Sequence, residues 1–263
     1  MTRAAAGLVC AGLALITSPA FEARAEQGAL VPLPAGLYTP FQRVKAANTG
    51  DTAAAAKPVA AFRLDEEPVT NGGYLDFVAT HPEWRRSETK LLFADPRYLR
   101  RWASDLDPGD AAPRHAPVTN VSWFAARAYC KARGLGLPTT AEWEYALADG
   151  GRGQDEVRAR SLDWFSKPNR EGPSAVGGEA NGYGVRDLVG LVWEWTSDFN
   201  AYAMTAESRD PNGKDPAAVC GGAAAGVVDP SDYPAFMRAA MRASLKASYT
   251  ADNLGFRCAG GAP

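Results

Sequence analysis

The stretch Asn181-Gly-Tyr-Gly-Val-Arg-Asp-Leu-Val-Gly-Leu-Val-Trp-Glu-Trp-Thr-Ser-Asp198 is the part of this sequence that decides the fold. Its glycines at positions 182, 184 and 190 allow the backbone positive φ angles or close approaches to other segments. Two tryptophans then flank Glu194, and such bulky, rigid side chains belong in a core rather than on a mobile loop. Taken alone, the stretch predicts a glycine-rich turn that leads into a core strand.

Three further segments extend this pattern along the chain. They are Glu67-Pro-Val-Thr-Asn71 with Tyr74, Phe77 and Val78, then Ala116–Trp123 with Ala128-Tyr-Cys130 and Leu137–Tyr145, and finally Asn253-Leu-Gly-Phe-Arg-Cys258. In this order they resemble the formylglycine-generating enzyme family, also called the sulfatase-modifying factor family. The resemblance spans Pro68 to Cys258 and implies a C-type-lectin-like α+β fold, rich in loops and poor in regular secondary structure.

The local patterns predict three helices in the first half of the chain. Thr70 can cap a helix over 71–80, and Ser122 can cap one over 123–133 that stops at Gly134. Thr139 with a glutamate three residues later forms a capping box for a helix through Ala148. After residue 150, short apolar pieces alternate with Gly, Pro, Asn and Asp and show no long helical period. Helices followed by short strands favour an α+β domain.

The N-terminus has the pattern of a secretory signal. Arg3 precedes an apolar run from Ala4 to Ile16, and Ala23-Arg-Ala25 fits a cleavage site between small residues. The run is too short to span a bilayer. We therefore expect a signal peptide over residues 1–25 and one domain over 26–263, with its core motifs within 60–260. The product is expected to be periplasmic or secreted, with no membrane association after cleavage.

Composition argues against two further classes of site. Outside residues 1–25 there are 26 basic and 29 acidic residues, a net charge of −3, which gives no reason to expect a nucleic-acid partner. The chain has two histidines, too few for a three-histidine iron or zinc site.

Three cysteines remain after the signal: Cys130, Cys220 and Cys258. An odd count in an oxidising compartment leaves at least one of them unpaired or paired between molecules. The resemblance implies a structural disulfide between Cys130 and Cys258, with Cys220 free. The alternative is that the first and last are reduced core cysteines.

The cysteine pair that the family uses for oxidation is missing. In family members it follows a Gly-Gly-Ser and supplies the thiolates for copper(I) and for exchange with the substrate cysteine. The matching stretch, Gly221–Tyr233, contains no cysteine. Without thiolates there is no nucleophile and no two-sulfur site for a soft metal, so formylglycine formation by that route is not expected.

A candidate groove remains near this stretch, formed by Cys220, Met237, Met241, Arg242 and Trp193. The two methionines are spaced i, i+4 and can face one direction on a helix. One thiol with two thioethers suits copper(I). The alternative is that all three sulfur-bearing residues fill the core.

The resemblance also implies a calcium site. Its ligands would be the Glu194 carboxylate and the backbone carbonyls of Gly190 and Val192, since oxygen ligands suit calcium. The family's asparagine in this segment is Leu191 here. The alternative is a glutamate that only hydrogen-bonds a loop.

Two branches of the family without the cysteine pair resemble this chain. One is associated with copper nitrite reductase gene clusters and the other with periplasmic siderophore maturation. The segments His81–Arg86, Tyr98–Trp102 and Gly190–Trp195 are more similar to the first. The leading interpretation is an exported accessory or maturation protein for a periplasmic copper or denitrification enzyme, with a protein or peptide partner. If it is an enzyme, it would be an oxidoreductase acting on a protein or peptide. The alternatives are a non-catalytic, lectin-like binding module and a copper(I)-handling protein.

Overall fold

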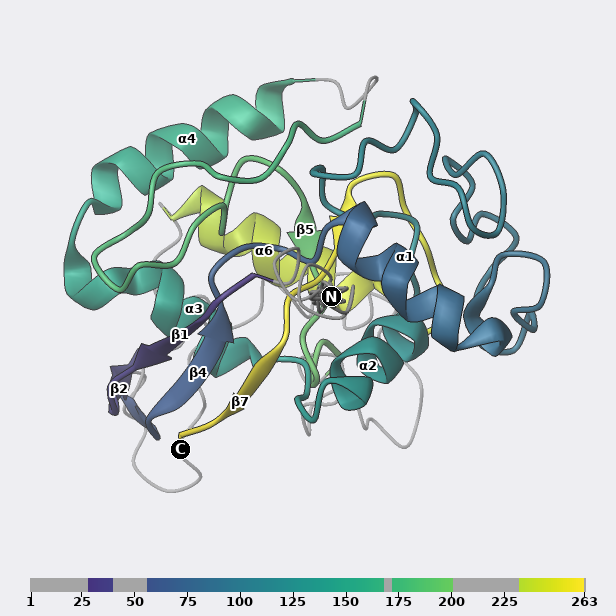
Figure 1. Cartoon of the computed structure of the whole chain (residues 1–263). Helices are drawn as coiled ribbons and strands as arrows, with labels where there is room; N and C mark the ends of the chain where they lie inside the picture. Colours follow the sequence, from purple (N-terminus) through teal and green to yellow (C-terminus); the bar gives the residue numbers. More distant parts are fainter. Residues whose placement is uncertain (1–27, 40–55, 168–171, 201–231, 263) are drawn as a thin grey trace, which may run out of the picture.

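The structure of the chain is a computed structural model, and it describes residues 28–39, 56–167, 172–200 and 232–262 (Figure 1). The expected signal over 1–25 lies outside these ranges. The helices and strands are β1 (Leu30–Leu33), β2 (Gly36–Tyr38), β3 (Lys57–Val59), β4 (Phe62–Asp65), α1 (Asn71–Thr80), η2 (Pro82–Trp84), α2 (Trp123–Ala132), α3 (Thr140–Ala148), η3 (Asp149–Gly151), α4 (Gln154–Ser166), β5 (Trp193–Glu194), α6 (Tyr233–Ser244), β6 (Leu254–Gly255) and β7 (Ala259–Gly261). Short strands and long irregular connections confirm the expected loop-rich α+β class.

Strand pairing brings the two ends of the described chain together. In the antiparallel sheet β1-β4-β7, Leu33 pairs with Phe62 and Phe62 pairs with Gly261. Figure 1 shows β7 beside β4 at the edge of the molecule. The short strands β5 and β6 pair in parallel, with Trp193 opposite Leu254. The tryptophan-rich stretch and the C-terminal motif, far apart in sequence, are therefore neighbours.

The three predicted helices begin where the capping residues indicate. The Thr70 side chain accepts from the Gly73 backbone N–H, and the Ser122 side chain accepts from the amide of residue 125. Thr139 and Glu142 form the complete capping box of α3. These side chains satisfy backbone donors that the first helical turn leaves without partners.

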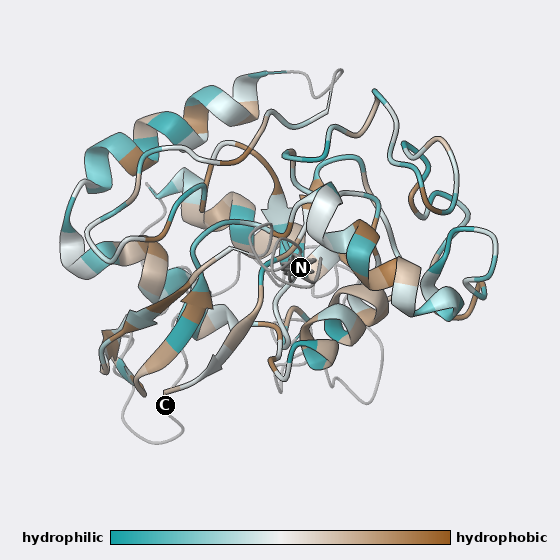
Figure 2. Ribbon diagram, viewed as in Figure 1, coloured by the Kyte–Doolittle hydropathy of each residue, from teal (hydrophilic) through white to brown (hydrophobic). Residues whose placement is uncertain are grey.

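The expectation of no long helical period after residue 150 is wrong for α4, which runs over 13 residues. The 12-residue helix α6 contains the helical piece that the spacing of Met237 and Met241 indicated. The spacing of the inward-facing residues of α4 is helical: Val157, Ser161, Trp164 and Phe165 occur at i, i+4, i+7 and i+8. A polar serine at one of these positions hides the apolar stripe in the sequence, and Figure 2 shows how polar most of this helix is.

Within the described ranges, the buried apolar residues form two clusters. One gathers around α1 and α2 and includes Tyr74, Trp195 and Phe256; the other lies between the β1-β4-β7 sheet and α3 and includes Leu64 and Trp143. Cys130 and Cys258 form a disulfide within the first cluster, with 5.5 Å between their Cα atoms. This is the pair that the family resemblance implied, and it ties α2 to the C-terminal segment.

Candidate functional site

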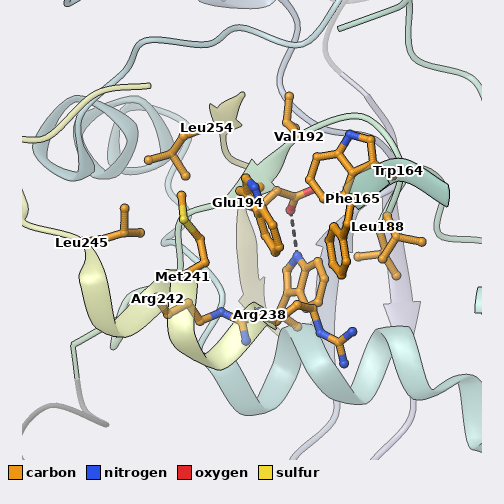
Figure 3. Close-up of a pocket in the computed structure, with 13 residues that line it drawn as sticks. Trp164, Phe165, Leu188, Val192, Glu194, Arg238, Met241, Arg242, Leu245 and Leu254 are labelled. Carbon is orange, nitrogen blue, oxygen red and sulfur yellow. Dashed lines mark hydrogen bonds between the residues drawn. The ribbon is translucent and has the colours of Figure 1, made fainter. Parts of the chain in front are cut away.

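An apolar pocket opens between α4, α6 and β5 (Figure 3). It is lined by Trp143, Trp164, Phe165, Leu188, Val189, Val192, Trp193, Glu194, Arg238, Met241, Arg242, Leu245 and Leu254. The cavity volume is about 20 Å³, which is room for about one water molecule. Aromatic walls with a few convergent polar groups are typical of binding sites.

Trp193 forms the aromatic centre of this pocket. The ring of Phe165 stacks on it with 5.2 Å between centroids and 14° between planes, and the Trp164 ring lies 4.8 Å away. Both partners come from the last turns of α4 and are only partly buried. The C-terminal end of α4 therefore covers Trp193 and determines how much of the pocket is open.

One wall carries a buried ionic cluster that joins α3 to α6. Arg238 donates to both carboxylate oxygens of Glu144, and Arg242 donates to Oε1 at 2.6 Å. The Arg242 guanidinium also lies 4.9 Å from the centre of the Trp143 ring. Burial raises the pKa of Glu144, but the charges and hydrogen bonds of the two arginines outweigh it and lower this pKa from 4.5 to about 2. Two guanidinium groups share one carboxylate.

Glu194 lines the pocket, and both of its carboxylate oxygens accept hydrogen bonds from other side chains. Its Oε2 accepts from Trp143 Nε1 and from Arg257 Nε, both at 2.8 Å, and its Oε1 accepts from Arg257 Nη2 at 2.8 Å. The side chains of Glu194 and Arg257 are both 0% exposed. The guanidinium already supplies the positive charge that calcium would bring. The carboxylate therefore does not fit a calcium site, and the geometry favours the alternative that Glu194 holds neighbouring segments together.

The structure brings together three residues of the predicted groove: Trp193, Met241 and Arg242 all line the pocket. Met237 lies one turn earlier on α6, as its spacing predicted, but is not one of the lining residues. Cys220 lies outside the described residues. Among the residues that the structure describes, no group of three or more His, Cys, Asp or Glu could hold a metal ion.

Sequence reasoning missed Trp164, Phe165 and Arg238 of the pocket lining, and it missed Glu144, the ion-pair partner of Arg238. Trp164 and Phe165 were missed together with α4, although their spacing from Val157 gave a signal. Arg238 and Glu144 were missed because their partnership joins helices 94 residues apart. The i, i+4 spacing of arginines 238 and 242 was the available signal, since it places two cations on one helix face.

The comparisons with known proteins agree with this architecture. A family model described as "Sulfatase-modifying factor enzyme 1-like domain" matches residues 17–262. The chain is 30% identical over 287 residues to "Inactive C-alpha-formylglycine-generating enzyme 2" of Mus musculus, covering 90% of this chain and 87% of that protein. It is 28% identical over 289 residues to "Formylglycine-generating enzyme" of Bos taurus, covering 88% and 74%. PvdO from Pseudomonas aeruginosa superposes with a TM-score of 0.53 at 19% identity, covering 90% of this chain and 95% of that one, a likeness that concerns the fold alone.

Proposed function

Because the chain belongs to the sulfatase-modifying factor family, we propose that it is an exported accessory or maturation protein of the formylglycine-generating enzyme fold that does not itself form formylglycine. The absence of cysteine from Gly221–Tyr233 carries this proposal. The family's oxidation needs a thiolate both for copper(I) and for disulfide exchange with the substrate. A relative of similar length is itself named inactive.

A peptide assay tests the negative half of the proposal. The purified protein is incubated with a sulfatase-type cysteine peptide and copper(I), and mass spectrometry then measures how much of the peptide cysteine has become formylglycine. We expect no aldehyde above the background without protein. Conversion that disappears when a residue in 220–242 is substituted would overturn the proposal.

The pocket supports a binding role. Trp193, Phe165 and Trp164 present an aromatic wall that an apolar side chain of a protein or peptide partner can stack against. The free pocket is narrow, so binding would require the end of α4 to move away from Trp193. The partner class we propose is a periplasmic copper or denitrification enzyme, which the resemblance to the nitrite-reductase-associated branch supports.

Complementation in the producing cell tests this partner class. Deleting the gene should lower the copper nitrite reductase activity of the periplasm, and the wild-type gene should restore it. Trp193→Ser should restore it poorly, whereas Leu162→Ser, on the exposed side of α4 (41% exposed), should restore it fully. Unchanged nitrite reductase activity after deletion would remove this assignment, and normal export of Trp193→Ser must be shown by immunoblot.

Copper(I) handling is the second candidate. The observation favouring it is that Met237 and Met241 lie one turn apart on α6, close in sequence to Cys220. Titration with copper(I) against a competing chelator tests it, using Met→Leu variants that keep the side-chain volume. Stoichiometric binding that is lost in Cys220→Ser and in either methionine variant supports the site. Binding that none of the three substitutions changes ends this interpretation.

A further inference from the structure

An exposed apolar turn lies on the α2 side of the molecule, away from the pocket. The backbone N–H groups of Phe93 and Ala94 donate to the Lys90 carbonyl, at 2.8 and 3.2 Å, so Leu91 and Leu92 form the tip of a turn. Leu91 is 72% exposed and Leu92 is 74% exposed. Two adjacent leucines projecting this far into water are unusual, and large exposed apolar groups mark interaction sites.

Ring contacts and a backbone hydrogen bond fix the turn to the rest of the domain. The Phe93 ring lies 6.0 Å from that of Trp84 and 5.6 Å from that of Phe124, measured between centroids. The backbone N–H of Asp95 donates to the Ser248 carbonyl at 2.8 Å. The leucines are therefore presented by a fixed support, which lowers the conformational entropy lost on binding.

A small excess of positive charge lies near the turn. Residues 83–101 contain six basic and three acidic residues. Two further carboxylates contact this segment, since Asp105 accepts hydrogen bonds from Ser87 and Asp252 pairs with Arg100, so the local excess is one positive charge. Lys90 precedes the leucines, and Arg127 lies over the Trp123 ring at 5.4 Å, on the helix that carries Phe124. Among the described residues Lys90 and Arg127 form no ion pair, whereas Arg97 pairs with Asp95 and Arg100 pairs with Asp252. An apolar tip with an unpaired lysine directly before it is complementary to an apolar surface that carries negative charge.

We propose that this turn is a membrane-docking site, in which Leu91, Leu92 and Phe93 enter the interface of an anionic lipid bilayer while Lys90 and Arg127 contact the headgroups. A turn whose tip carries two adjacent leucines, 72% and 74% exposed, is suited to entering lipid. Lysine is depleted at protein interfaces but can keep its charge at a membrane surface while its stem is buried. The proposal differs from the sequence-based expectation of no membrane association, and the experiment below tests the two against each other. It is independent of the proposed accessory function.

Vesicle co-sedimentation of the mature protein tests the site. The probes are vesicles of equal parts phosphatidylglycerol and phosphatidylcholine, and vesicles of phosphatidylcholine alone. We expect binding to the anionic vesicles that weakens as salt rises from about 0.05 to 0.5 M. Leu91→Ser with Leu92→Ser should weaken it at least tenfold, because each leucine loses its apolar transfer energy. Lys90→Gln with Arg127→Gln should weaken it and flatten its salt dependence.

Leu37→Ser is the matched control, because Leu37 is 69% exposed and lies in β2. It should leave vesicle binding unchanged. The proposal is overturned if the wild type does not bind anionic vesicles, or if the leucine variant and the Leu37 control bind equally. It is also overturned if sedimentation velocity shows that the leucines instead join two copies of the chain.

Discussion

Two buried ionic clusters in this protein differ in their balance of charge. Around Glu194, one carboxylate meets one guanidinium, that of Arg257, and both side chains are 0% exposed. Around Glu144, one carboxylate meets two guanidinium groups, those of Arg238 and Arg242, and the three side chains are 7–11% exposed. The first cluster is electrically neutral, whereas the second keeps one positive charge beside the pocket.

The two clusters also differ in what surrounds them. Arg257 also donates to the backbone carbonyls of Asp65, Glu66 and Arg186 at 2.9 to 3.2 Å, so together with its pairing to Glu194 it joins the segments at 65–66, 186 and 194. Such a network leaves no group free for a ligand. The two arginines of the Glu144 cluster instead line the pocket, where Asp232 is a further acidic neighbour of Arg238.

Breaking the neutral cluster should have the largest effect. Glu194→Gln leaves the buried Arg257 guanidinium without its counterion and should lower the free energy of unfolding by about 3–5 kcal/mol. Glu156→Gln, on the exposed face of α4, should change it by less than about 0.5 kcal/mol. Urea denaturation at pH 7 measures both. A loss below about 1 kcal/mol in Glu194→Gln would show that this cluster does not hold the fold.

Loss of the Cys130–Cys258 disulfide should have the next largest effect on stability, and this disulfide lies close to the Arg257 network. Cys258 donates its backbone N–H to Asp65, which also pairs with Arg133 at 2.7 Å. The double variant Cys130→Ala, Cys258→Ala lacks the disulfide, which links residues 128 positions apart and so restricts the unfolded chain. Its loss should lower the free energy of unfolding by roughly 2–5 kcal/mol. Thermal unfolding of the double variant against the oxidised wild type measures it. Equal thermal midpoints would contradict the prediction.

The charged cluster should reveal itself through pH. The pKa of Glu144 is about 2 in the folded protein against 4.5 in the unfolded chain. The ionised, paired carboxylate therefore adds stability above about pH 4.5, and this contribution is lost as the pH falls toward 2. It amounts to about 3 kcal/mol. Unfolding free energies between pH 7 and pH 2 should fall less steeply in Glu144→Gln. If the unfolding free energy falls equally steeply with pH in the wild type and in Glu144→Gln, this cluster does not contribute to the acid sensitivity of the protein.

Local signals in the sequence were enough for the framework. Thr70, Ser122 and Thr139 are capping residues whose effect is confined to the next helical turn, so the three helices could be predicted from short windows. The family resemblance implied the disulfide and the loop-rich fold. It also placed Trp193 and Met241 near one site.

The ionic partnerships could not be read from the sequence. Glu194 and Arg257 are 63 residues apart, and nothing in either local pattern says that the carboxylate would meet a guanidinium rather than calcium. α4 was missed because its inward stripe contains Ser161, whose hydroxyl bonds the Val157 carbonyl inside the helix. Long-range charge pairing and tertiary packing decide both features, and neither leaves a short sequence pattern.

The smallest expected effect distinguishes the two clusters most sharply. Arg238→Met keeps an unbranched stem and leaves Arg242 and Glu144 as a balanced pair at 2.6 Å. It should cost about 1 kcal/mol or less, because no charge is left without a partner. Arg257→Met, the same substitution in the neutral cluster, leaves the fully buried Glu194 carboxylate without a counterion. It should therefore lower the free energy of unfolding by about 3–5 kcal/mol.

Urea denaturation of the two methionine variants side by side makes this comparison. The acid transition of Arg238→Met should also move to higher pH, because Glu144 loses one of the two cations that lower its pKa. Equal losses in both variants would mean that Arg238 is as structural as Arg257. In that case the surplus charge could not be attributed to the pocket, since both guanidinium groups of the cluster would be needed to hold α6 on α3.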